Sequence, residues 1–115
     1  MAEDYDPEAL ESAFEDIALE LLGGMFPRVD VASYYRAAVK HVEDDIRGHR
    51  DQVRIVGSMD AFSRLWYVAL NRVASAYVLI TGRRDEEGVD RLMGRYEALM
   101  RIYLEDRGLI TRAGG

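Results

Sequence analysis

Two histidines and an aspartate on one predicted helix are the residues best suited to bind a metal ion. His41, Asp45 and His49 follow one another at intervals of four residues. Positions four apart differ by only about 40° around an α-helix, so the three side chains would share one face. Imidazole nitrogens and a carboxylate oxygen are ligands for zinc and other first-row metals. The chain has no cysteine and no third histidine, so the set is incomplete. We therefore favour a structural role for these residues and expect no metal and no other cofactor.

An arginine and a histidine on the same predicted helix have the spacing of a nuclease motif. Residues 36–41 read RAAVKH, with Arg36 and His41 at the two ends. This segment resembles the R-x4-H motif of the HEPN ribonucleases, an all-α family of similar size. The resemblance implies RNA cleavage by Arg36 and His41 at a dimer interface. Positions five apart on a continuous helix diverge by about 140°, which points against a shared site.

Arginines supply fourteen of the fifteen basic residues, with Lys40 alone. Arg47, Arg50 and Arg54 are the candidate contacts to phosphate or nucleic acid, because a guanidinium group can donate two hydrogen bonds to phosphate oxygens. An acid, Asp51, interrupts this cluster, and no aromatic residue lies within 47–54 to stack on bases. The pattern therefore disfavours a nucleic-acid partner.

The acidic residues are concentrated at the start of the chain. The 115 residues carry a net charge of −6, yet residues 1–25 alone hold eight acids and no base. The other ninety residues hold thirteen acids and fifteen bases, a net of +2. This asymmetry is typical of a partner-steering surface or of an intramolecular contact. We favour a solvated helix face, in which the acids lie toward the N-terminal end of the first helix. The acidic start is unlike a signal peptide, and no run of eighteen apolar residues exists, so we expect a cytoplasmic protein without membrane contact.

Apolar residues recur at three- and four-residue steps in four segments, which predicts an all-α fold. We expect one domain, 1–115, folded as a compact four-helix bundle. Helices are predicted near 7–22, 31–48, 59–81 and 86–107. The Gly23–Gly24 pair is expected to stop the first helix, and the ends, 1–5 and 109–115, are expected to fray. The pattern over 49–57 fits either an extended connector or more helix.

The third predicted helix is apolar on nearly every side, which is typical of a central helix contacted on two faces. Phe62, Trp66, Val73 and Tyr77 are expected to fill the core. A second face then stays apolar, and soluble monomers seldom expose such a patch. We therefore expect a homodimer or higher oligomer. An alternative is that the first helix and the Met25–Phe26 connector cover this face. The predicted interface residues are Arg64, Tyr67, Val68, Asn71, Val78 and Leu79.

These patterns favour a non-catalytic helical module for protein–protein interaction, such as a small regulator, adaptor or assembly subunit. Its partner would be a second copy of the chain, with another protein as a further candidate. The alternative is a nucleic-acid-processing protein, either a small helical RNA-binding subunit or a HEPN-like ribonuclease that uses Arg36 and His41. A metal-binding helical protein that uses His41, Asp45 and His49 is the third possibility.

Overall fold

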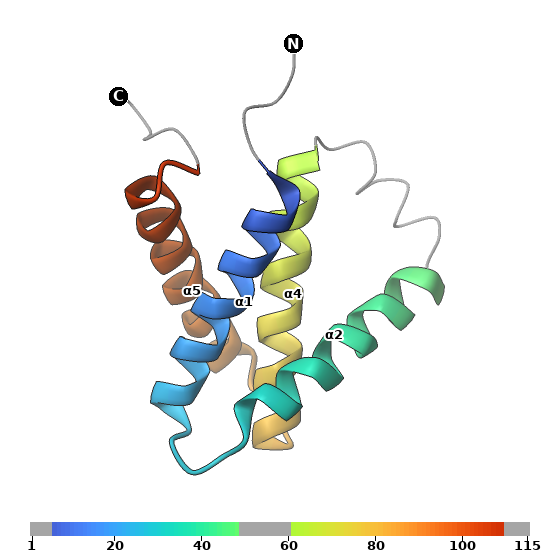
Figure 1. Ribbon diagram of the computed structural model, residues 1–115. Helices are drawn as coiled ribbons and strands as arrows, with labels where there is room; N and C mark the ends of the chain where they lie inside the picture. The colour runs from blue at the N-terminus through green and yellow to red at the C-terminus, as the bar shows by residue number, and fades with distance from the viewer. Residues whose placement is uncertain (1–5, 49–60, 110–115) are drawn as a thin grey trace.

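The computed structural model describes residues 6–48 and 61–109 and folds them into helices, with no strand in this part of the chain (Figure 1). The helices are α1 (Pro7–Met25), α2 (Val31–Gly48), α4 (Ala61–Thr81) and α5 (Glu86–Asp106). Figure 1 shows α1 and α5 running in opposite directions, with α4 behind α1, while α2 leans away from α4 toward its C-terminal end. The predicted all-α four-helix fold is confirmed.

Aspartates explain where α1, α2 and α5 begin. Asp6 accepts a hydrogen bond of 3.0 Å from the backbone N–H two residues later. Asp30 accepts bonds from the N–H and the hydroxyl of Ser33, at 3.3 and 2.6 Å. These bonds, the hydroxyl first, hold the pKa of Asp30 below its ordinary value. Asp85 accepts a bond of 3.2 Å from the Gly88 N–H. In each case a carboxylate satisfies an N–H group that has no partner within its helix.

The end of α1 differs from the prediction. The expected stop at Gly23–Gly24 is wrong, because the helix continues to Met25. The Phe26 N–H still donates to the Leu22 carbonyl at 2.8 Å, but the Phe26 dihedrals, φ −128° and ψ 68°, have left the helical region. Pro27 explains this change, since the residue before a proline is disfavoured in the helical conformation.

The other predicted ends lie close to the observed ones. α4 ends at Thr81, before Gly82 with φ +70°, while positions 59 and 60 lie outside the described residues. α5 ends one residue before the predicted 107. Of the ends expected to fray, only Leu109 is described; it packs against the core, and its N–H donates to the Leu104 carbonyl at 2.8 Å. The segment 49–57 also lies outside the described residues.

One apolar core joins α1, α4, α5 and the first part of α2. The Tyr96 hydroxyl lies inside it and donates a buried hydrogen bond of 2.6 Å to the Phe14 carbonyl, which ties α5 to α1. None of the described helices has the length and apolar content needed to cross a membrane. The largest fully buried side chains are those of Leu10, Leu22, Val73, Tyr96, Met100 and Leu104.

Candidate functional sites

The first candidate site is a hollow of about 480 Å³ where α2, α4 and the start of α5 meet, here called the α2–α4 pocket. It brings together residues from two separate sequence predictions, the metal set and the interface set. Charged side chains from α5 and the preceding loop complete its wall. The predicted residues that line it are His41, Asp45, Asn71, Val78 and Leu79, beside Arg84, Glu86 and Asp90.

The predicted metal ligands form a surface pair in this pocket. His41 Nε2 lies 3.9 Å from Asp45 Oδ2, and both side chains are more than half exposed. His49 lies outside the described residues. Within residues 6–48 and 61–109, no group of three histidine, aspartate or glutamate side chains could hold a metal ion. At this distance and exposure, the pair is a weak ion pair when the imidazole is protonated.

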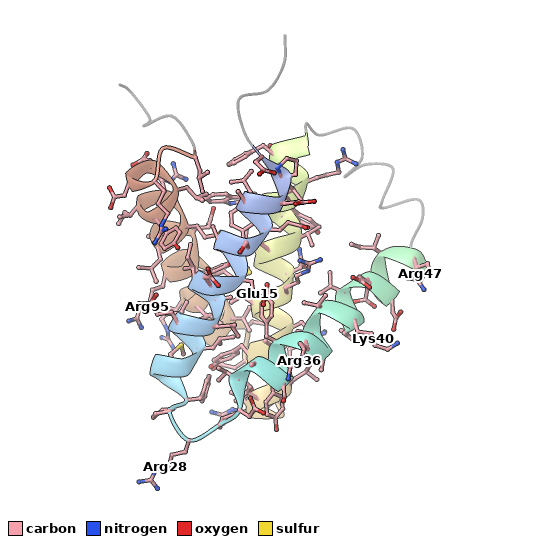
Figure 2. The ribbon with its side chains drawn as sticks, viewed as in Figure 1. Glu15, Arg28, Arg36, Lys40, Arg47 and Arg95 are labelled. Atoms are coloured by element: carbon pink, nitrogen blue, oxygen red, sulfur yellow. The ribbon has the colours of Figure 1, made fainter. Side chains whose placement is uncertain are left out.

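The predicted ribonuclease pair does not converge. Arg36 and His41 lie on one continuous helix, so their side chains leave it about 140° apart. Arg36 donates to the Ser33 hydroxyl at 3.3 Å and is not among the residues that line the α2–α4 pocket, whereas His41 is. Of the predicted phosphate contacts, Arg47 is exposed in the last turn of α2, at the outer tip of the bundle (Figure 2). Arg50 and Arg54 lie outside the described residues.

The six predicted interface residues, called here the α4 outer face, are unevenly exposed. Tyr67 and Leu79 are 45% and 41% exposed, and Arg64 is also exposed. Val68, Asn71 and Val78 are half-buried. α2 shields part of this face, since residues of α2 close the α2–α4 pocket over it.

The Met25–Phe26 segment, which the sequence suggested as an alternative cover for the α4 outer face, lies elsewhere. Phe26 packs on the ring of Tyr77 with centroids 6.1 Å apart. Tyr77 is a core residue, not a member of the α4 outer face. Phe26 therefore packs against the core instead of covering the α4 outer face, and Met25 is the exposed last residue of α1.

A second hollow was not predicted from the sequence. It has a volume of about 650 Å³, lies between α1 and α5, and is called here the α1–α5 groove. Three of its residues are apolar side chains with large exposed fractions: Met25 and Leu99 at 38% and Ile102 at 57%. Ile102 was the available signal, because it is a large apolar residue that departs from the three- and four-residue steps of Leu92, Tyr96, Leu99 and Tyr103. The other lining residues are Ile17, Glu20, Leu21, Gly24, Arg95, Tyr103 and Asp106.

Polar side chains from different helices also approach one another inside the bundle. Burial raises the pKa of Tyr35 on α2, and the Arg72 guanidinium on α4 opposes that rise. Burial, and then the nearby Tyr35, raise the pKa of Tyr96 on α5. The Nε atom of Arg72 is buried without a hydrogen-bond partner. Polar groups of α2, α4 and α5 therefore lie near one another inside the bundle.

No family model matches the chain, and no curated protein and no solved structure matches it.

Proposed function

We propose that this chain is a non-catalytic helical interaction module that self-associates through the α4 outer face. The observation that supports the proposal most is the exposure of Tyr67 and Leu79, at 45% and 41%, on a helix that also supplies the core. Val68 and Val78 lie beside them and are only half-buried. Burial of apolar surface drives most protein association, and a two-fold contact would cover the same side chains on both copies.

The nucleic-acid and metal-binding alternatives have less support within residues 6–48 and 61–109. The Arg36 and His41 side chains diverge on one helix, which disfavours a shared ribonuclease site. The His41–Asp45 pair has no third ligand there.

Light scattering on the purified full chain after size-exclusion chromatography tests the proposal. We expect a mass of at least about 26 kDa, twice the 13.1 kDa of one chain. Val68→Asp should lower that mass, because it places an unpaired carboxylate in the contact. Ala37→Asp is the matched control, since Ala37 is exposed on α2 and should leave the mass unchanged.

Circular dichroism establishes whether each variant keeps its helices. Tyr67→Glu provides a second test if Val68→Asp fails to fold, because Tyr67 is the more exposed of the two. A wild-type chain that stays at 13.1 kDa at high concentration would overturn the proposed function.

A further inference from the structure

We propose that the α1–α5 groove is a second self-association surface, which packs α1 of one copy against α5 of another. This inference rests on the proposed function, self-association, but it concerns a surface that shares no residue with the α4 outer face. The two contacts could therefore form at once and would build assemblies larger than a dimer.

The apolar part of the groove supports a protein contact. Of the seven large apolar side chains that the described residues expose, three line this groove, namely Met25, Leu99 and Ile102. The α4 outer face contributes two, Tyr67 and Leu79. The walls of the groove are the C-terminal parts of α1 and α5, and the two helices run in opposite directions (Figure 1). A pair of helices from another copy would convert this layer into an antiparallel four-helix arrangement.

The charges at the rim indicate which occupant the groove suits. Glu20 stands on the α1 wall and Arg95 on the α5 wall, and both are exposed. Figure 2 shows Arg95 on the side of the bundle away from α2. Within the described ranges, neither side chain forms a hydrogen bond or an ion pair. α1 itself, Pro7–Met25, contains five acids and no base. The groove thus offers the unpaired acid Glu20 on the α1 wall and the unpaired base Arg95 on the α5 wall. The α5 wall also carries one acid, Asp106, eleven positions beyond Arg95.

A two-fold axis parallel to the groove would pair Glu20 and Arg95 of each copy with the opposite charge on the other copy. Rotation about this axis places α1 of each copy on α5 of the other, so Glu20 faces the partner's Arg95 twice. A two-fold axis across the groove would instead place α1 on α1, where acids meet acids. Charge complementarity therefore selects a second copy, in the first of these two orientations.

Charge reversal tests this geometry on the full-length chain. We expect the wild-type mass to exceed about 26 kDa, twice the chain mass of 13.1 kDa, and to rise with concentration. Glu20→Arg and Arg95→Glu should each lower the mass to that of the dimer formed by the α4 outer face, because each places like charges together at two symmetric positions. The double variant should restore the wild-type mass, because it exchanges the charges and keeps the pairs.

Matched controls reverse charges elsewhere. Glu43→Arg on α2 and Arg28→Glu after α1 alter exposed residues outside the groove and should leave the mass unchanged. Single reversals in the groove that leave the mass unchanged, or a double variant that stays small, would overturn the inference.

The same measurements show which of the two proposed surfaces is wrong, because each error gives a different result. If only the α4 outer face is wrong, Val68→Asp has no effect and the charge reversals reduce a dimer to a monomer. If only the groove is wrong, the wild type is a dimer of about 26 kDa that Val68→Asp disrupts and charge reversal does not.

Discussion

Two glycines of α5 have opposite surroundings although they lie in the same helix. A Cβ atom added at Gly88 would lie 2.7 Å from the Tyr77 hydroxyl and against the carboxylate of Asp85, the residue that caps the helix. A Cβ atom added at Gly94 would have no atom within 4 Å. The absence of a side chain is therefore needed at Gly88 and costs stability at Gly94.

Alanine substitution at these two glycines should change stability in opposite directions. Gly94→Ala should raise the free energy of unfolding by about 0.5–1 kcal/mol, because alanine loses less backbone entropy in a helix. Gly88→Ala should lower it by about 1 kcal/mol or more, because the new methyl group displaces the Asp85 cap or the Tyr77 hydroxyl. Urea unfolding followed by circular dichroism measures both. A Gly88→Ala variant as stable as Gly94→Ala would contradict this account.

At the scale of elements, Tyr96 joins the last helix to the first. Its hydroxyl donates to the Phe14 carbonyl, and burial raises its pKa above the ordinary 10.0. Below pH 10 the phenol is neutral in the folded and the unfolded chain, so its contribution to stability is fully present. Above pH 10 the unfolded chain ionises first, and the contribution is lost as the pH rises. The pKa of Tyr35 is raised as well, so Tyr35 also contributes stability that is lost as the pH rises above 10.

Tyr96→Phe should isolate this link between α1 and α5. We expect the variant to be about 1 kcal/mol less stable at pH 7, since it loses one buried hydrogen bond. Its stability should also decline less steeply above pH 10 than that of the wild type. Tyr34→Phe, at an exposed position on α2, is the control. Urea unfolding at several pH values measures this. If the free energy of unfolding falls equally above pH 10 in the wild type and in Tyr96→Phe, the role given to the Tyr96 hydroxyl is contradicted.

Much of the helical architecture could be predicted from the sequence because it depends on neighbouring residues. Asp30 caps α2, and Gly82 ends α4, through contacts that span a few positions. The predicted stop at Gly23–Gly24 is wrong because Pro27, not the glycines, sets the end of α1. Leu104 is fully buried and continues the four-residue spacing from Met100, which is a local pattern of the same kind.

The candidate sites were less predictable because they depend on which helices become neighbours. Leu99 is an apolar residue of α5 that is exposed and lines the α1–α5 groove, and its exposure depends on how α1 and α5 pack. The groove joins the first helix to the last, and no local pattern encodes that pairing. His41 and Leu79 came from separate predictions, and only the crossing of α2 and α4 brings them to one pocket.

At the scale of the whole molecule, self-association links stability to concentration. An assembly that forms only from folded chains shifts the unfolding equilibrium by mass action. The melting temperature of the wild type should therefore rise by a few degrees for each tenfold increase in protein concentration. A variant with both Val68→Asp and Glu20→Arg should melt at one temperature throughout. Thermal unfolding followed by circular dichroism over a hundredfold concentration range checks this. A melting temperature that changes equally with concentration in the wild type and in the variant would contradict it.

The position of Trp66 makes its fluorescence a probe of how the helices unfold. It is the only tryptophan in the sequence. Its ring meets Phe14 of α1 edge-on at 6.0 Å, and its indole N–H donates to Glu97 Oε2 of α5 at 3.2 Å. Its emission therefore follows the junction of three helices, whereas the far-ultraviolet signal counts all the helical residues. When both are recorded in one titration, coincident transitions are expected, because Tyr35 and Ala38 place α2 in the same core as the other helices. Separate transitions would show that α2 unfolds apart from the junction that Trp66 reports.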